Sequence, residues 1–379
     1  MSIRECVAAY GGHLLAPTPG KSPGSARIIV CVPVRNEADR VGRCLKSLSE
    51  AFGAEAHVLL LVNDTDDGTQ AAIEAASSRL ACGITVVDVG WRNGCGSAGR
   101  ARLLAMAIAH RLAPGAILYS TDADTLVAPD TMTVLDGHFA EGFDLVCGRI
   151  GFIAEEAALL EAVDPARDAA IRAYRETTRH IAALLFPDPD NPWPHHGNIG
   201  GANFAITADA YRRIAPLPVV ASGEDRLLRR HCEAHGMRIT YSNALRVETS
   251  CRLDGFTQGG LSAELTRNRH EADPEVDEML ERPSELLRRL RLRYLMEHEN
   301  DRQRVAKCLA ARGMTPEHAA RLADLEPRTL AWLRVENELA CLRRERLRFS
   351  AMKRYLPGLE RLHRRIEEAS RDRPPARAR

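Results

Sequence analysis

Short apolar runs alternate with amphipathic stretches over the first third of the chain. The apolar runs are rich in β-branched residues, and the stretches between them repeat apolar residues at helical spacing. Alternating strands and helices are typical of an α/β protein with a mainly parallel sheet. The pattern predicts strand 27–34, helix 39–52, strand 57–62, helix 69–80, strand 84–89, helix 97–112 and strand 116–120.

Two of the predicted strands are apolar at every position. They read IIVCV at 28–32 and VLLLV at 58–62, which is expected when helices cover both faces of a sheet. Ligands of such sheets bind beyond the carboxyl ends of the strands. The polar residues at these ends are Arg35, Asn36 and Glu37, then Asn63 and Asp64, and finally Asp122 and Asp124, with a glycine loop after the third strand.

The composition along the chain suggests four segments. Residues 11–25 are rich in Gly, Pro and Ser without a period, whereas the sequence after 255 shows long helical patterns dense in Arg, with helix starts at Pro283 and Thr315. We therefore predict a flexible lead-in over 1–26, an α/β domain over 27–255, a helical region over 256–370 and a disordered tail over 371–379.

Charge and cysteine content narrow the functional classes. The chain has 52 Lys and Arg against 51 Asp and Glu, so it lacks the basic field that would recruit nucleic acid. Its ten cysteines form no C-x-x-C pair, which predicts reduced thiols in the cytoplasm. We expect no transmembrane segment, because no run of about 18 apolar residues occurs. The arginine-rich C-terminal helices present a solvated face, with a membrane-surface contact or a homo-oligomer contact as alternatives.

The segment YSTDADTLVAPD carries the first candidate chemistry. Asp122 and Asp124 lie two residues apart just after an apolar strand, where their side chains share a face. Two such carboxylates can hold Mn²⁺ or Mg²⁺ together with the oxygens of a diphosphate. A solvated acidic turn is the alternative, and the motif alone does not decide between them.

A glycine loop offers a competing interpretation. Residues 94–99 read GCGSAG, a G-x-G-x-x-G pattern between a strand and a helix, which is found at dinucleotide sites. Trp91 and two further residues separate the strand from the first glycine, however, and two βα units precede the loop, unlike the usual dinucleotide arrangement. A diphosphate contact and a plain turn are the other two interpretations.

Six segments together resemble family 2 glycosyltransferases. In order they are VCVPVRNEADRVGRCLKSL, LLLVNDTDDGT, the helix start at Ala101-Arg102, STDAD, GGANFAITADAYRRI and SGEDRLLRRH. The resemblance covers residues 27–255 and implies the GT-A fold and a nucleotide-sugar donor. Its metal motif is the DXD pattern of Asp122 and Asp124.

The resemblance also implies roles on the donor side. Pro33, Arg35, Asn36 and Glu37 would line the nucleoside, and Asn63 would contact the base, with Asp64 as the alternative for that contact. Helix capping is the other explanation for Asn36 and Glu37.

Arg102 would lie near the phosphates, although Leu103 replaces the family's usual Asn, and a solvated helix face is the alternative. Arg252 would reach the diphosphate. Residues 247–252 contain no histidine to serve as a third metal ligand, as some relatives have.

On the acceptor side, Asp225 would be the base that deprotonates the acceptor hydroxyl, beside Glu224 in the same acidic pair. A helix N-terminus that favours acidic residues is the alternative explanation for the pair.

The sequence thus predicts a metal-assisted, inverting glycosyltransferase. Its donor would be a nucleotide diphosphate sugar, with uridine as the expected base, and its acceptor a hydroxyl of a small molecule, glycan or lipid. A nucleotidyltransferase on a related fold, an NAD-binding oxidoreductase and a non-catalytic nucleotide-sugar binder are the alternatives.

Overall fold

The structure is a computed structural model that describes residues 2–16, 23–156, 164–220, 222–252, 266 and 271–371. The chain divides into two compact units. We call the first, Met1–Leu160 with His196–Cys232 and Met237–Glu264, the sheet unit. The second, Glu161–His195 with Glu233–Gly236 and Leu265–Arg379, is the helical unit.

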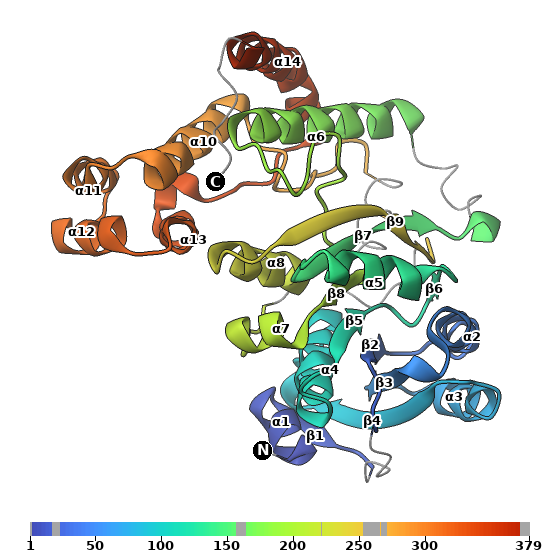
Figure 1. Cartoon of the computed structure of the whole chain (residues 1–379). Coiled ribbons are helices and arrows are strands. Elements are labelled where there is room, and N and C mark those ends of the chain that lie inside the picture. The colour runs from blue at the N-terminus through green and yellow to red at the C-terminus, as the bar shows by residue number, and fades with distance from the viewer. Residues whose placement is uncertain are drawn as a thin grey trace. The chain divides into compact units, whose positions relative to one another are not determined.

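The strands of the described residues form one nine-stranded sheet with the order β1-β4-β3-β2-β5-β8-β7-β9-β6 (Figure 1). The strands are β1 (Gly12–Leu14), β2 (Ile28–Val34), β3 (Ala56–Asn63), β4 (Gly83–Trp91), β5 (Ile117–Ser120), β6 (Thr125–Val127), β7 (Leu145–Phe152), β8 (Phe204–Ile206) and β9 (Ile239–Thr249).

The sheet changes character halfway across. β4, β3, β2 and β5 are parallel neighbours, as predicted. β8 then pairs antiparallel with both β5 and β7, and β1 and β6 run antiparallel at the two edges. The predicted mainly parallel sheet therefore holds for the first half, and the sheet as a whole is mixed.

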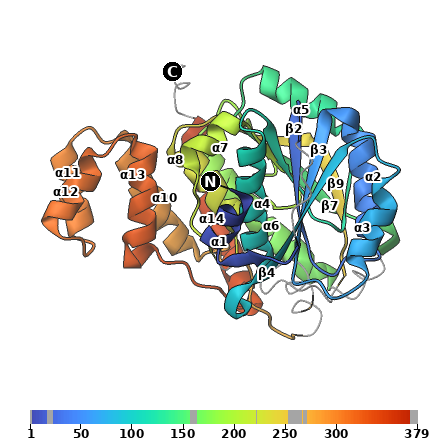
Figure 2. The ribbon, with the colours of Figure 1, turned by 90° about the horizontal axis from the view of Figure 1, so that it is seen from below.

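Helices cover both faces of the sheet (Figure 2). Ile29 and Cys31 of β2 pack in one core, whereas Ile28 and Val30 pack in the other, so alternate residues of one strand enter opposite cores. This explains why the strand is apolar at every position. The first core includes residues of α1 (Ile3–Ala9), α4 (Ala98–Leu112), α7 (Ala208–Ile214) and α8 (Glu224–Ala234), and the second includes residues of α2 (Val41–Phe52), α3 (Thr69–Ser77) and α5 (Thr131–Ala140).

The predicted lead-in over residues 1–26 is wrong for residues 3–14. α1 begins with a capping box, in which the Ser2 side chain accepts a hydrogen bond from the Glu5 backbone and Glu5 returns one. β1 then pairs with the edge of β4. Cys6 and Val7 are buried in the first core, so burial of apolar surface holds this segment in the fold.

The helical unit is built from α6 (Pro165–Leu185), α10 (Pro283–His298), α11 (Arg302–Ala310), α12 (Pro316–Asp324), α13 (Arg328–Glu338) and α14 (Phe349–Arg371). α10 begins at Pro283 and Thr315 caps α12, as predicted. The predicted tail falls outside the described residues from position 372 onward. Whether 27–255 and 256–370 are separate folding domains stays a prediction.

Of the helices that the structure describes, none is both long enough and apolar enough to cross a lipid bilayer.

Candidate active site

Hydrogen bonds join the loop after β2 to the loop after β3. Asn36 donates from Nδ2 to Asp66 Oδ1 (2.8 Å) and accepts from the Asp66 backbone N–H (3.0 Å). The backbone N–H of Glu37 donates to Thr69 Oγ1 (2.8 Å). Asn36 and Asp64 have φ angles of 52° and 42°, and they are the two non-glycine residues with positive φ in the described part of the chain. Such strained backbone is concentrated at functional sites, so these loops form a preorganised edge.

Asn63 lies at the end of β3 and uses its amide within the protein. Its Nδ2 donates to the Val34 carbonyl (2.8 Å), and its Oδ1 accepts from Trp91 Nε1 (3.1 Å), so it ties together the ends of three strands. The residue is 4% exposed. The predicted base contact therefore does not suit Asn63. Its neighbour Asp64 is only half-buried and accepts a 3.3 Å hydrogen bond from the Trp91 backbone.

Pro33 and Arg35 flank the end of β2. Pro33 is a buried strand residue in register with Leu61 of β3, so its ring has a packing role. Arg35 is half-buried at the start of the loop that fastens Asn36. Of the predicted nucleoside edge, Arg35, Asn36 and Asp64 are thus the residues with solvent access.

Arg102 is a buried hub on α4. Its Nε donates to Glu224 Oε1 (2.9 Å) and its Nη2 to Asp122 Oδ1 (2.6 Å). Its Nη1 donates to Ser120 Oγ (2.9 Å) and to the Gly201 carbonyl (2.8 Å). The two carboxylates raise the pKa of the Arg102 guanidinium against the effect of burial, so it stays charged. The alternative of a solvated helix face is wrong, because the side chain is only 5% exposed.

Two glycines make room for this ion pair. A Cβ on Gly201 would lie 2.4 Å from the Arg102 guanidinium, and a Cβ on Gly99 would lie 2.4 Å from Glu224 Oε2. The Arg102–Glu224 pair therefore needs glycine at both positions. Through this pair, Arg102 fixes the Glu224 side chain at the start of α8.

The glycine loop has a structural explanation. Gly94 has a φ of 62°, which favours glycine. A Cβ on Gly96 would lie 2.3 Å from the Trp91 ring, and Gly99 is the residue that lies against Glu224. Since each glycine of the G-x-G-x-x-G pattern has a local reason within the protein, the pattern no longer supports a dinucleotide site.

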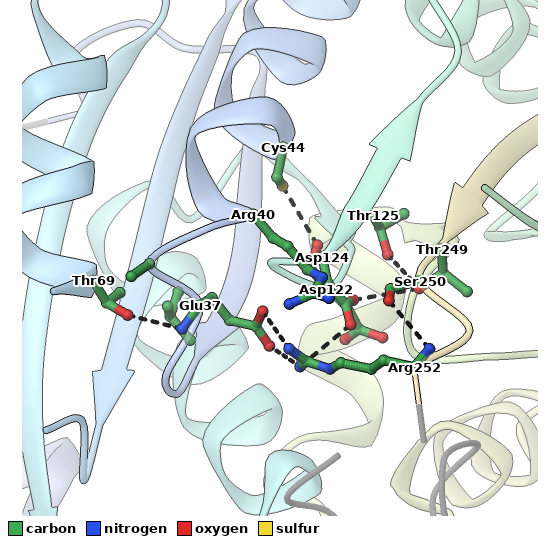
Figure 3. A network of polar contacts seen from close by, with 12 residues as sticks. Glu37, Arg40, Cys44, Thr69, Asp122, Asp124, Thr125, Thr249, Ser250 and Arg252 are labelled. Carbon is green, nitrogen blue, oxygen red and sulfur yellow. Dashed lines mark hydrogen bonds and ion pairs between the residues drawn. The ribbon is translucent and has the colours of Figure 1, made fainter. Parts of the chain in front are cut away.

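Asp124, Glu37 and Arg252 form a second charged cluster, shown in Figure 3. Arg252 donates from Nη1 to Glu37 Oε2 (2.9 Å) and from Nη2 to Glu37 Oε1, and its Nη2 also lies 3.4 Å from Asp124 Oδ2. Thr249 Oγ1 donates to Asp124 Oδ1 (3.3 Å). The Arg252 guanidinium is therefore shared between two carboxylates that lie on different loops.

Burial raises the pKa of both carboxyl groups in this cluster. The pKa of Glu37 rises to about 7, chiefly through desolvation, against the hydrogen bonds from Arg252 and with a further rise from Asp124. The pKa of Asp124 rises to about 6, through desolvation and then through the charge of Asp122. Desolvation thus disfavours the ionised forms of Glu37 and Asp124, and a bound cation would stabilise these ionised forms.

The end of β9 holds Arg252 in place. The backbone N–H of Ser250 donates to the Asp124 carbonyl (3.2 Å). Glu156 Oε2 accepts from Ser250 Oγ (2.6 Å) and from the Cys251 backbone N–H (3.0 Å). The sequence analysis did not identify Glu156, although its place just after β7, at the carboxyl edge of the sheet, is the signal that would have found it.

Asp225 lies at the start of α8 next to Glu224. Its Oδ1 accepts from the Arg226 backbone N–H (2.6 Å), and its residue is half-buried. Desolvation and the adjacent Glu224 carboxylate raise its pKa above the ordinary aspartate range. A partly accessible carboxylate with a raised pKa is suited to act as a general base.

The donor set at Asp122 and Asp124 fits a divalent cation that is only partly held by protein. Asp122 is the more accessible of the two, with a side chain 34% exposed against 16% for Asp124. Within the described ranges, no three His, Cys, Asp or Glu side chains are arranged to hold a metal ion. Mg²⁺ is commonly bound by one or two carboxylates together with water and substrate phosphates, so two aspartates suffice as the protein's share.

The sheet unit thus contains two charge clusters, Arg102 with Asp122 and Glu224, and Arg252 with Glu37 and Asp124. The charge of Asp122 acts on Asp124 and that of Glu224 on the adjacent Asp225. The structure sets Pro33 and Asn63 apart as buried structural residues. The sequence analysis also missed Trp91 as the partner of Asn63.

The model of the family described as Glycosyl transferase family 2 matches residues 29–194. No curated protein sequence is similar enough to this chain to count as a relative. The match includes the predicted nucleoside edge, Arg102 and both aspartates of the DXD motif.

Several solved structures are distantly similar. Mannosyltransferase PcManGT from Pyrobaculum calidifontis, in complex with GDP-Man and Mn²⁺, is 17% identical, with 92% of this chain and 90% of that chain covered and a TM-score of 0.43. Glucosyl-3-phosphoglycerate synthase from Mycobacterium tuberculosis, in complex with Mn²⁺, UDP-Glc and phosphoglyceric acid, is 19% identical over 71% and 82%, with a TM-score of 0.39. S. aureus TarS 1–349 is 13% identical over 91% of each chain, with a TM-score of 0.41. None of these similarities bears on the donor, acceptor or cofactor of this chain.

The mixed sheet flanked by helices confirms the predicted α/β fold with a helical C-terminal region. Over residues 29–194 the chain is thus similar to glycosyl transferase family 2, the family that the sequence analysis predicts.

Proposed function

We propose that the chain transfers a sugar from a nucleotide diphosphate sugar to an acceptor hydroxyl, with Mn²⁺ or Mg²⁺ and with inversion at the anomeric carbon. The observation that carries this proposal is the linkage between two sets of carboxylates. Arg102 joins Asp122, on the predicted metal motif, to Glu224, which directly precedes the predicted base Asp225. One buried guanidinium would thus hold a metal ligand and the residue next to the base.

The roles follow from exposure and charge. Asp122 and Asp124 would hold the cation, which supplies charge neutralisation to the diphosphate leaving group when it is bound. Arg35, Asn36 and Asp64 would line the nucleoside, because they are the residues of the predicted nucleoside edge that are partly accessible. We propose uridine as the base.

Asp225 would take the proton of the acceptor hydroxyl as its oxygen attacks the anomeric carbon. A bond then forms between the acceptor oxygen and that carbon, and the bond from the carbon to the diphosphate oxygen breaks. The raised pKa of Asp225 brings this carboxylate closer to the operating pH, which favours proton transfer. Arg102 and Glu224 would act by positioning, since their contacts lie within the protein.

A thermal-shift panel tests the donor class. Specific binding stabilises the folded state by mass action, so one of UDP-glucose, UDP-galactose, UDP-N-acetylglucosamine, GDP-mannose and their nucleoside diphosphates should raise Tm with Mn²⁺ present. The shift should vanish on chelation and in Asp124→Asn. If no nucleotide sugar stabilises the wild type while NADH does, the proposed function is wrong.

A further inference from the structure

The contacts of Arg252 point to a control of the metal affinity of the site, an inference that rests on the proposed function. Arg252 occupies the position from which a cation would neutralise Asp124. Its side chain is 13% exposed, and its guanidinium is bound bidentately by Glu37 and lies 3.4 Å from Asp124 Oδ2 (Figure 3). Attraction between unit charges at such a distance is strong when water is largely excluded.

We propose that Arg252 is an internal counter-ion that competes with the divalent cation for Asp124 until a nucleotide diphosphate draws the guanidinium away. Metal alone then binds weakly, and metal and diphosphate bind cooperatively. The chain's own arginine makes the cation site selective for the metal–nucleotide pair over free metal.

The anchoring of Arg252 supports this exchange. Its backbone is fixed close to the site, because Ser250 N–H donates to the Asp124 carbonyl and Glu156 holds Ser250 and Cys251. The long side chain can therefore change partner by rotating about its own bonds, without movement of β9. A guanidinium pairs equally well with a carboxylate and with a phosphate, bidentately in both cases.

Glu37 acts as a positioning residue for the Arg252 guanidinium. It binds Arg252 through both oxygens, whereas Asp124 receives one longer contact. Glu37 therefore offers the guanidinium a second partner when the cation takes Asp124. Without Glu37, Arg252 would have Asp124 as its main carboxylate partner and would compete with the cation more strongly.

The test is titration of Mn²⁺ alone, followed by electron paramagnetic resonance of the free ion, with and without saturating UDP or GDP. In the wild type, the nucleotide should tighten Mn²⁺ binding about tenfold, within the range typical of coupled sites. Arg252→Ala should bind Mn²⁺ alone about tenfold more tightly than wild type and show a smaller nucleotide effect, because only ligation of the cation by the diphosphate then couples the two. Glu37→Gln should bind Mn²⁺ alone more weakly than wild type.

Two controls separate this effect from general changes. Arg43→Ala removes an exposed cation of α2 that pairs only distantly with Glu155 (4.0 Å), so Mn²⁺ affinity should stay as in wild type. Arg252→Gln keeps the length of the side chain without its charge and should behave like Arg252→Ala. A similar Tm for each variant shows that folding is intact.

The outcomes are separable from those of the proposed function. Tighter Mn²⁺ binding in Arg252→Ala, together with a smaller nucleotide effect than in wild type, supports the counter-ion. Unchanged or weaker Mn²⁺ binding in both Arg252 variants, with binding still abolished by Asp124→Asn, overturns the counter-ion and leaves the metal site standing. Absence of Asp124-dependent Mn²⁺ binding in wild type and in both Arg252 variants overturns both proposals.

Discussion

At the scale of single residues, Arg102 sets most of the polar geometry of the site. It pairs with two carboxylates while it is almost fully buried, and its other contacts reach β5 and the turn at Gly201. Breaking such a pair by removing one partner leaves uncompensated buried charge, which typically costs about 3–5 kcal/mol. The role of Arg102 is therefore to place Asp122 and α8, and its side chain has little capacity left for a phosphate.

Gly201→Ala tests this placement without removing a charge. The new methyl would lie 2.4 Å from a guanidinium that four hydrogen bonds hold in place, so we expect a loss of about 1–3 kcal/mol in unfolding free energy and a strong loss of turnover. Gly42→Ala is the matched control. It lies at the second position of α2 with nothing within 4 Å, so it should not lower the unfolding free energy. Equal denaturation midpoints for Gly201→Ala and Gly42→Ala would contradict the proposed role of Arg102 in placing Asp122 and α8.

Asp124→Asn tests whether the ionised Asp124 carboxylate lowers the unfolding free energy of the protein. The folded pKa of Asp124, about 6, lies above its unfolded value, so ionisation destabilises the fold increasingly from about pH 4 to pH 6 and fully above pH 6. The variant should therefore be more stable than wild type at pH 8, by about 2 kcal/mol, although it cannot transfer sugar. The gain should shrink as the pH falls from 6 to 4. Urea denaturation at both ends measures it, and a loss of stability at pH 8 would contradict the account.

The sequence places these residues in one site but does not reveal their pairing. Asp122, Arg102 and Glu224 follow strands or begin helices, so each is predicted at the carboxyl edge of the sheet. Their contacts join positions 20 and 122 residues apart, and they depend on how α4 packs against β5 and α8. For Asn63, the motif match predicts the position of the residue but not its partner. Its amide oxygen accepts a hydrogen bond from Trp91, so the amide is used within the protein.

At the scale of elements, the parallel half of the sheet is the part that the sequence predicts best. Continuous apolar strands and periodic helices give a strong signal there. β8 and β6 are three residues each, too short for a period, so the sequence pattern does not predict the antiparallel pairs that they form. α1 is also short, and its one local signal was the S-x-x-E capping box at Ser2 and Glu5.

Val7→Ala tests whether α1 is part of the fold. Val7 is fully buried against the first core, so losing two methyl groups should lower the unfolding free energy by about 2 kcal/mol. Val219→Ala removes the same atoms from a side chain that is 39% exposed and should have little effect. A flexible lead-in would instead make both substitutions neutral in thermal unfolding.

At the scale of the whole molecule, the sheet collects residues from distant parts of the sequence at one edge. Glu37 and Arg252 are 215 positions apart and form a bidentate ion pair. Three features that the proposed sugar transfer needs lie at this edge of the sheet. They are carboxylates for a cation, hydrogen-bonded loops for a nucleoside and a carboxylate suited to act as a base. The central claim is that Asp124 serves the donor and Asp225 serves the acceptor step.

The most direct test is turnover of the donor that the thermal-shift panel selects, measured as nucleoside diphosphate release by wild type, Asp124→Asn and Asp225→Asn. We predict that both variants lose release by at least about a hundredfold, in the range typical of general acid–base groups. Asp225→Asn should keep Mn²⁺-dependent donor binding, whereas Asp124→Asn should lose it. Undiminished release by Asp225→Asn, or unchanged Mn²⁺-dependent donor binding by Asp124→Asn, would contradict this account of the site.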